Sequence, residues 1–282
     1  MTAIVGLLHP GSMGAAFGAQ LRTRGITVLW CPEGRSGATR QRAEQADLEP
    51  DSFPSLLARS DVLLSLCPPA AAEDVAEHVA QYRFPDKTYV EANAIAPPRM
   101  RRIAERLSPE TVIDAAVVGS PPVGGKYPTL YLSGPSERAG QIEELFAGTD
   151  VHTHFLGNET GKASALKLAY SSYQKVSRIL AAVAYGAADA HGVADELLAI
   201  AGKRTGTYLT ETDYIPKTAA RAWRWGPELE DAAAMLADAG LPDALMHAAV
   251  DTLAQWRLAK NEFLTVTQAL EMLRDIPASG PC

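Results

Sequence analysis

Short apolar runs alternate with amphipathic stretches along the first half of the chain. Helical periodicity, with apolar residues three to four positions apart, covers 12–22, 70–81 and 97–107. Apolar runs that predict strands lie at 3–8, 26–30, 61–66, 88–92, 111–115, 129–133 and 151–156. Strands that alternate with helices favour a parallel sheet covered on both faces.

The pattern changes near residue 158, where the strand signals end. The stretch 161–190 is rich in alanine, lacks proline and has Gly186 as its internal glycine, so it predicts one long helix. About 30 helical residues would span about 45 Å, which is too long for one compact domain. Further helical patterns follow at 196–202, 215–225, 227–239 and 242–273. We therefore predict an α/β domain over 1–158 and an all-α domain over 159–282, linked by the long helix.

Composition and charge exclude several classes of protein. The chain has 282 residues, of which 47% are hydrophobic, and this is typical of a globular protein. A formal net charge of −7 argues against nucleic-acid binding, which usually needs a basic surface. No apolar run is long enough for a membrane span. The three cysteines (Cys31, Cys67 and Cys282) have no metal-ligand spacing, so they predict a cytoplasmic chain without a disulfide framework or a bound metal.

The first predicted strand leads into a glycine-containing turn and a helix. In this context, dinucleotide-binding turns read Gly-x-Gly-x-x-Gly, and the free N–H groups of the helix bind a pyrophosphate. Here the turn reads His9-Pro10-Gly11-Ser12-Met13-Gly14, with histidine in place of the first glycine. Gly11 lets the backbone approach a phosphate, and Gly14 permits close packing of helix and strand. The residues from His9 to Met13 are therefore candidate cofactor ligands, and an ordinary tight turn is the alternative.

The end of the second predicted strand bears on which dinucleotide would bind. Glu33 has the spacing of the acidic residue that holds the ribose 2′-hydroxyl of NAD. Arg35 and Ser36 follow at the start of a helix, and such side chains suit the 2′-phosphate of NADP. We favour NADP, while Glu33 keeps NAD open. In the alternative interpretation, Ser36 only caps the helix and Arg35 only contacts solvent.

Over most of its length the sequence resembles the β-hydroxyacid dehydrogenase and 6-phosphogluconate dehydrogenase-like family. The resemblance rests on the glycine-containing turn, on Asp114-Ala115-Ala116-Val117-Val118-Gly119-Ser120 and on Gly161-Lys162-Ala163-Ser164-Ala165-Leu166-Lys167. Within the family it looks most like a poorly characterised bacterial and archaeal branch. The resemblance implies a Rossmann-type domain followed by an all-helical domain, usually in a homodimer.

The resemblance also implies that Lys167, on the long helix, is the catalytic residue. A lysine at a domain interface is partly desolvated, which lowers its pKa towards the range of an acid–base catalyst. Ser171 and Gln174 follow at i+4 and i+7, so they share a helix face with Lys167 and are candidate substrate-binding residues. The alternative for this polar stripe is a solvated helix face.

Three other segments match or depart from the family. Relatives have Ser-Gly-Gly where this chain has Val118-Gly119-Ser120. Gly119 and Ser120 are therefore candidate substrate-binding residues, with Val118 at the position of the family's serine. Asn93 matches a family segment near the nicotinamide. Cys67 and Pro68 end a strand at the carboxyl edge of the predicted sheet, where cofactors bind in open α/β folds. We interpret Cys67 as a packing residue rather than a nucleophile, because no histidine pattern accompanies it.

Three functions fit these observations. The first is an NADP-dependent dehydrogenase or reductase acting on a small hydroxy or keto compound, with Lys167 as acid–base. The second is imine reductase-like reduction of a C=N bond by NADPH. Imine reductases share the fold but typically have Asp or Tyr in place of the lysine, and Tyr170 lies one turn from Lys167. The third is a non-catalytic NADP-binding protein.

Overall fold

The structure is a computed structural model that describes residues 3–82, 86–203, 206 and 212–274. Contacts divide the chain into two compact units, Met1–Tyr173 and Gln174–Cys282. The division falls inside helix α7 (Lys162–Ala190), whose 29 residues agree with the long helix expected from the sequence. The boundary near residue 158 precedes this helix and stays a prediction.

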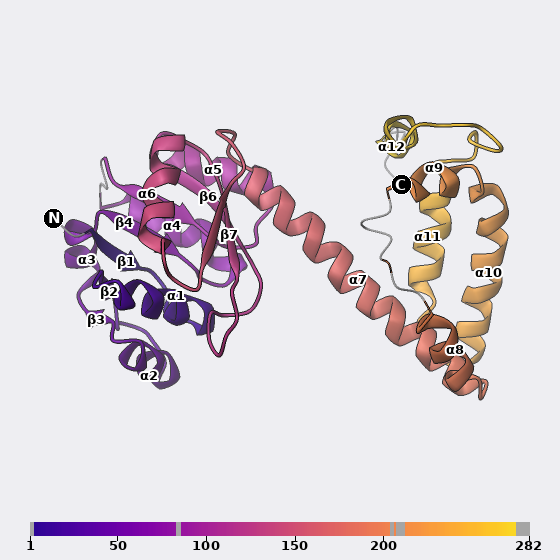
Figure 1. The fold of residues 1–282 in the computed structure, drawn as a ribbon, viewed down its shortest axis with the longest axis horizontal. Helices are drawn as coiled ribbons and strands as arrows, with labels where there is room; N and C mark the ends of the chain where they lie inside the picture. The colour runs from indigo at the N-terminus through magenta and orange to yellow at the C-terminus, as the bar shows by residue number, and fades with distance from the viewer. Residues whose placement is uncertain (1–2, 83–85, 204–205, 207–211, 275–282) are drawn as a thin grey trace. The chain divides into compact units, whose positions relative to one another are not determined.

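The first unit is built around an eight-stranded sheet with the order β3-β2-β1-β4-β5-β6-β7-β8 (Figure 1). The strands are β1 (Ile4–Leu7), β2 (Thr27–Trp30), β3 (Glu49–Pro50), β4 (Val62–Ser65), β5 (Thr88–Glu91), β6 (Val112–Val118), β7 (Thr129–Ser133) and β8 (His152–Phe155). Adjacent strands are parallel except for β6 and β7. The segment 119–128 between those two is too short for a crossover helix, so the chain returns antiparallel.

Helices cover both faces of this sheet, as the alternating pattern predicts. They are α1 (Ser12–Thr23), α2 (Gly37–Gln45), α3 (Phe53–Arg59), the 3₁₀ turn η1 (Pro69–Ala71), α4 (Ala72–Ala80), α5 (Pro97–Leu107) and α6 (Ser136–Phe146). On one face, Phe17 of α1 and Phe146 of α6 pack on strand residues such as Leu130. On the other face, Met100 of α5 belongs to a core that includes Tyr89. The predicted α/β, Rossmann-type class is confirmed.

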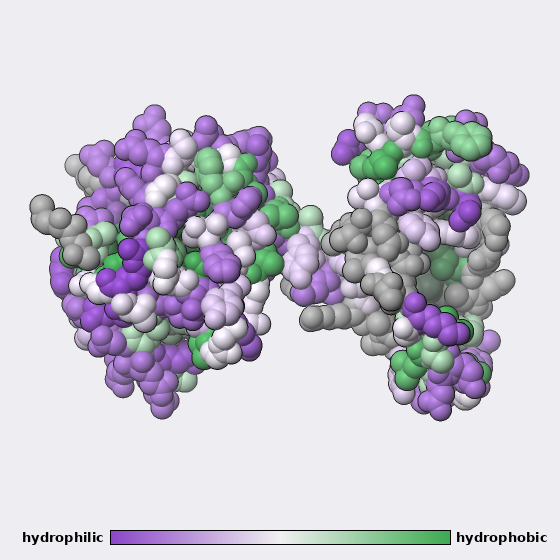
Figure 2. All heavy atoms as spheres, in the orientation of Figure 1, coloured by the Kyte–Doolittle hydropathy of each residue, from purple (hydrophilic) through white to green (hydrophobic). Residues whose placement is uncertain are grey.

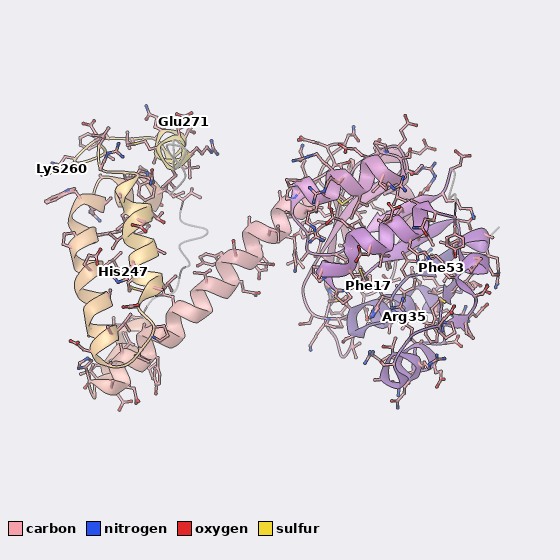
Figure 3. The ribbon with its side chains drawn as sticks, turned by 180° about the vertical axis from the view of Figure 1, so that it is seen from behind. Phe17, Arg35, Phe53, His247, Lys260 and Glu271 are labelled. Carbon is pink, nitrogen blue, oxygen red and sulfur yellow. The ribbon has the colours of Figure 1, made fainter. Side chains whose placement is uncertain are left out.

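The second unit is all-helical over its described residues, which confirms the predicted class. It holds the end of α7, then α8 (Ala194–Ala201), α9 (Tyr214–Ala219), α10 (Ala222–Asp238), α11 (Ala244–Ala254) and α12 (Val266–Arg274). Helices α10 and α11 lie side by side, and Leu236 and Met246 meet in their core (Figures 1 and 3). A second small core surrounds Trp256.

Two predicted helices in this unit have different limits in the structure. The stretch 242–273 forms α11 and α12 rather than one helix. Asn261 has a φ of 62° between them, and α12 begins with a capping box. In that box Gln268 N donates to Thr265 Oγ1 at 3.2 Å, and Thr265 N donates to Gln268 Oε1 at 2.8 Å. Helix α10 starts at Ala222 and contains Pro227, at which the sequence predicts a start.

The visible face of the first unit is mainly hydrophilic in Figure 2, and apolar residues are exposed on the second unit. Among these, Ile200 is 67% exposed, Leu258 75% and Phe263 103%. No helix of the described residues is long and apolar enough to cross a membrane. Nor do the described residues contain a group of three or more His, Cys, Asp or Glu side chains able to hold a metal ion.

Candidate functional site

The predicted site residues of the first unit follow one edge of the sheet. Each lies in the segment that follows a strand: Arg35 after β2, His9 after β1, Cys67 after β4, Asn93 after β5 and Gly119 after β6. The sheet order places these five strands next to one another. With about 4.8 Å between strands, the row spans roughly 19 Å. This edge can therefore accommodate an extended ligand, and it is where ligands bind in open α/β sheets.

The turn after β1 is shaped by its histidine. A side chain at Gly11 would place its Cβ 3.1 Å from His9 Nδ1, and one at Gly14 would collide with the His9 carbonyl oxygen. A side chain at Gly11 would therefore crowd the imidazole, which has no counterpart in the usual fingerprint. Ser12 begins α1, and the first turn of this helix has no acidic side chain to occupy its free N–H groups. The helix end, which includes Met13, therefore retains its positive potential.

His9 and Arg35 leave buried polar atoms without partners at this turn. Among the described residues, His9 Nδ1 and Arg35 Nε are the buried side-chain nitrogen or oxygen atoms that lack a hydrogen bond. Arg35 is half-buried and Nη2 donates to Leu8 O at 2.9 Å, so it does not merely contact solvent (Figure 3). Burial, and after it the Arg35 guanidinium, lower the pKa of His9. The site thus offers donors and positive charge, which fits a phosphate group.

Arg42 of α2 joins this cluster and was missed in the sequence. Its Nε donates to Pro10 O at 3.5 Å, and its Nη2 donates to Thr39 Oγ1 at 3.2 Å. Ser36 is the N-cap of α2 and accepts a hydrogen bond from Thr39 N at 3.3 Å, so its capping role is real. No local pattern distinguishes Arg42 in the sequence, because its contact with Pro10 joins residues that are distant along the chain.

Glu33 borders a hollow whose lining includes neither of these arginines. It is exposed and lines a shallow hollow of about 240 Å³ together with Pro32, Pro50 and Ser52. This hollow lies beside the ends of β2 and β3. The carboxylate is therefore accessible, while the basic groups gather around the turn after β1.

A buried polar cluster lies beneath Cys67 and Asn93. Asn93 N donates to Glu91 Oε1 at 3.1 Å, and Asn93 Nδ2 also bonds this oxygen. The same Nδ2 lies 3.1 Å from Ser65 Oγ and 3.3 Å from Cys67 Sγ. The Tyr89 hydroxyl completes the cluster at 3.3 Å from Glu91 Oε2. Cys67 and Asn93 are thus brought together, and Glu91, Ser65 and Tyr89 are additional residues that the sequence analysis missed.

Burial dominates the acid–base properties of this cluster. It raises the pKa of Glu91 to about 7. Burial, followed by the charge of Glu91, raises the pKa of the Cys67 thiol. A thiol with a raised pKa is a weak nucleophile at neutral pH. This agrees with our interpretation of Cys67 as a packing residue. Pro68 follows it and leads into η1.

A second buried carboxylate, Asp114 of β6, holds the start of α7. Its Oδ2 accepts from Gly161 N at 2.9 Å, from Ser164 N at 3.1 Å and from Ser133 Oγ at 2.9 Å. Its Oδ1 accepts from Ser164 Oγ at 2.6 Å. A carboxylate at a helix N-terminus satisfies free N–H groups and complements the helix dipole. Asp114 therefore fixes α7 to the sheet, although the sequence analysis treated it only as part of a motif.

Lys167 lies one turn after this anchor. It is half-buried, and Nζ donates to Val117 O at 2.8 Å, near the end of β6. Gly119 follows β6 with a φ of 126°, and a Cβ there would lie 2.9 Å from Pro128 Cα. The next residue, Ser120, is exposed. The structure thus brings Lys167 to the segment that contains Gly119 and Ser120.

The other two predicted substrate residues lie further along α7. Ser171 is half-buried and is still in the first unit, four residues after Lys167. Gln174 is the first residue of the second unit, and its role stays a prediction. That unit contains an apolar groove of about 500 Å³ lined by Leu180, Val193, Leu197, Ile200 and Met235, among others. None of the predicted site residues lines this groove.

Comparisons with known proteins agree with this architecture. The reductive aminase of Aspergillus terreus, in complex with NADPH and ethyl levulinate, is 19% identical, and the match covers 96% of this chain and 99% of that one, with a TM-score of 0.71. The conserved protein MTH1747, of unknown function and structurally similar to 3-hydroxyacid dehydrogenases, is 24% identical, with 91% and 98% covered and a TM-score of 0.59. The chain has the 3-hydroxyacid dehydrogenase-like and imine reductase fold.

Two comparisons by sequence add to this likeness of fold. Residues 188–256 match DUF1932, a domain of unknown function, and this match lies wholly in the second unit. A curated relative from Methanothermus fervidus, an uncharacterized 28.5 kDa protein encoded in the 7S RNA 5′ region, is 28% identical over 176 residues. That alignment covers 62% of this chain and 67% of the relative.

Proposed function

We propose that this protein is an NADP(H)-dependent oxidoreductase that transfers hydride between the nicotinamide and a small molecule, with Lys167 as the acid–base. One observation carries the proposal. At the carboxyl ends of adjacent strands, the candidate residues extend from the His9–Arg35 cluster, which fits a phosphate, to Lys167 of α7, which contacts the end of β6. NADPH in the complex of the Aspergillus terreus reductive aminase supports the same cofactor here.

The chain's own residues suggest how the cofactor would be held. His9, Arg35 and the start of α1 would bind phosphate groups, and Arg42 reinforces the positive charge there. The exposed Ser36 hydroxyl and the Glu33 carboxylate would border the ribose. Cys67, Pro68 and Asn93 would border the nicotinamide end of the row. When bound, the cofactor supplies the hydride.

Lys167 would handle the proton that accompanies the hydride. Its ammonium is held against Val117 O, which orients it towards the carboxyl edge of the sheet. From there it can donate a proton to the carbonyl oxygen of the substrate during reduction, or, as the neutral amine, accept the proton of the substrate hydroxyl during oxidation. Ser171 and Gln174 on α7, with Gly119 and Ser120 after β6, would contact the rest of a small substrate.

Cofactor binding is the first test. Fluorescence titration should give a lower dissociation constant for NADPH than for NADH, because the arginine side chains can pair with the 2′-phosphate. Arg35→Ala should weaken NADPH by about tenfold to a hundredfold, since a charge-assisted pair is lost, and should weaken NADH less. Arg106→Ala, at an exposed pair with Glu77, is the matched control. Equal losses for both cofactors would refute the 2′-phosphate assignment.

Turnover is the second test. The protein and NADPH are mixed with keto acids, aldehydes and cyclic imines, and NADPH absorbance is followed. Lys167→Ala should lower turnover at least a hundredfold with cofactor affinity retained. Lys162→Ala, on the same helix and paired with Glu159, is the control and should leave turnover unchanged. Equal turnover in both variants would remove Lys167 from the mechanism.

A second candidate function is reduction of a C=N bond. It is favoured by the TM-score of 0.71 with the reductive aminase, against 0.59 with the hydroxyacid dehydrogenase-like protein. Tyr170 is 37% exposed and lies one turn after Lys167, so it is a second acid on the helix. Turnover of cyclic imines that Lys167→Ala leaves intact and Tyr170→Phe abolishes would establish this function. Cofactor binding without turnover on any substrate would instead favour the non-catalytic alternative.

We also propose that the protein works as a cytoplasmic homodimer. Support for association comes from exposed apolar side chains of the second unit, including Leu198 and Ile200. Cys31 and Cys67 are both free thiols, as a reducing compartment would allow, and Cys282 lies outside the described residues. Light scattering after size-exclusion chromatography should give twice the chain mass of 30.0 kDa.

A further inference from the structure

Glu91 is a buried carboxyl group to which the proposed mechanism assigns no role. It is the last residue of β5 and is fully buried. Asn93, which follows two residues later, binds Glu91 Oε1 through its backbone N–H and its side-chain amide. Glu91 therefore lies directly beneath a residue of the proposed nicotinamide end of the site.

The described groups that hydrogen-bond Glu91 are uncharged, and the nearest cation that the described contacts show is Arg101 of α5, which lies against Gly161 where that residue binds Asp114. Within the described part of the chain, no Lys, Arg or His forms an ion pair with it. The titratable groups around it are Tyr89 on its own strand, Cys67 after β4, and Asp114, its register partner on β6. The helices on this face, α4 and α5, contribute the apolar side chains of Ala76, Val79, Met100 and Ile103 to the core.

A carboxyl group in such a place responds strongly to a nearby charge. Burial raises its pKa to about 7, so its two protonation states are close in free energy at neutral pH. A cation that arrives nearby favours the carboxylate, whereas a neutral group leaves the protonated acid favoured. The cluster is therefore sensitive to the sign of charge at the ends of β4 and β5.

The two forms of the proposed cofactor differ in this respect. The oxidised nicotinamide ring carries one positive charge and the reduced ring carries none, while their phosphate groups are the same. The His9–Arg35 cluster lies after β1 and β2, and Lys167 of α7 contacts the end of β6. The ring would therefore lie between them, at β4 and β5, above Asn93 and Glu91.

We propose that Glu91 is an internal counter-charge that discriminates between the oxidised and the reduced cofactor. As a carboxylate it stabilises the cationic ring of NADP+. When NADPH is bound, the neutral acid is the favoured form. This inference rests on the proposed function, because it requires the nicotinamide at this edge. Binding of NADP+ then releases a proton from Glu91 to solvent, and binding of NADPH does not.

The size of the effect follows from Coulomb's law. Two unit charges roughly 10 Å apart, at an effective dielectric constant of about 20, change an affinity on the order of tenfold. The ratio of the dissociation constants of NADP+ and NADPH should therefore fall about tenfold as the pH rises through 7. Titration of His9 or of the 2′-phosphate affects both forms alike, so it cancels in this ratio.

The experiment measures both dissociation constants by calorimetry from pH 5.5 to 8.5. The unmodified protein should show the pH-dependent ratio, and Glu91→Gln, which keeps an acceptor oxygen for Asn93, should show a ratio independent of pH. Glu105→Gln, an exposed position on α5, is the control and should behave like the unmodified protein. Buffers of different ionisation enthalpy then report proton release at pH 6.5, which should be larger for NADP+ than for NADPH. This last measurement needs no variant.

The outcomes separate the two proposals. Binding of both cofactors by the unmodified protein with a ratio independent of pH, or equal proton release for both, overturns the role of Glu91 and leaves the proposed function standing. A pH-dependent ratio that persists in Glu91→Gln also overturns it. If neither cofactor binds, the proposed function fails, and this inference fails with it.

Discussion

Two buried carboxyl groups, Asp114 and Glu91, are neighbours in the sheet but have different surroundings. They face each other in register on β6 and β5, in a row of four fully buried polar residues that begins with Ser65 and ends with Ser133. Asp114 accepts four hydrogen bonds, two of them from N–H groups at the start of a helix. Glu91 is surrounded by the Asn93 amide, the Tyr89 phenol and the Ser65 hydroxyl. None of these donors is at the start of a helix.

This difference teaches what a buried acid can do in one fold. Burial raises the pKa of both groups, and the hydrogen bonds to each act in the opposite direction. For Asp114 these donors come from two strands and a helix, so the carboxylate joins elements together. For Glu91 they come mainly from its own strand and the residues that follow it, so the group can change its charge without separating elements. One acid serves the structure and the other is available for function.

The largest expected effect comes from removing the structural acid. Asp114→Ala leaves the hydroxyls of Ser133 and Ser164 and two backbone N–H groups buried without an acceptor. It should therefore lower the free energy of unfolding of the first unit by about 3 kcal/mol or more. Urea unfolding measures this, with Asp61→Asn as control, because Asp61 accepts one exposed bond from Ile4 N. A loss below about 1 kcal/mol would mean that Asp114 does not anchor α7.

The second effect is the pH dependence that Glu91 gives to stability. Its pKa is about 7 in the folded protein against 4.5 in the unfolded chain, so the folded state binds more protons between these values. Stability is fully present below pH 4.5 and falls by about 3 kcal/mol as the pH rises to 7. The difference in urea midpoint between the unmodified protein and Glu91→Gln isolates this term. A flat difference across this range would show that the folded-state pKa of Glu91 is ordinary.

The smallest effect comes from trimming the set of donors around Asp114. Ser164→Ala removes one hydroxyl hydrogen bond of 2.6 Å and leaves three others. The expected loss is about 1 kcal/mol, measured by urea unfolding as before. Ser172→Ala, which removes an exposed bond within the same helix, is the control and should cost less. A loss as large as that of Asp114→Ala would contradict the additive contribution of the four bonds.

The sequence predicted most strands and the long helix, but it did not predict which distant residues contact one another. Periodicity found most strands of the first unit and the long helix, because their apolar faces are continuous. It missed β3 (Glu49–Pro50), which has two residues, and it joined α11 to α12. In the latter case the signal was present: Thr265 and Gln268 have the spacing of a capping box, and Asn261 tolerates a positive φ.

The residues of the candidate site likewise include some that the sequence identifies and some that only the structure reveals. The motif positions, such as Gly11 and Lys167, follow from local sequence, and the sheet order then places them on one edge. Glu91 and Arg42 could not be identified, because their importance depends on residues far away in sequence. Ser65 lies beside Glu91 only because β4 pairs with β5, and Arg42 reaches Pro10 only because α2 packs near the turn after β1. Pairing between distant segments is not encoded in any local pattern.

The anchor at the start of α7 also determines how the protein can be divided or recombined. A fragment ending at residue 158 would lack Gly161 and Ser164, and Asp114 would keep only its bond from Ser133. A fragment ending at Tyr173, where the first unit ends, retains every one of these donors. An exchange of helical units between relatives would therefore have to leave the first turns of α7 with the sheet that they complete.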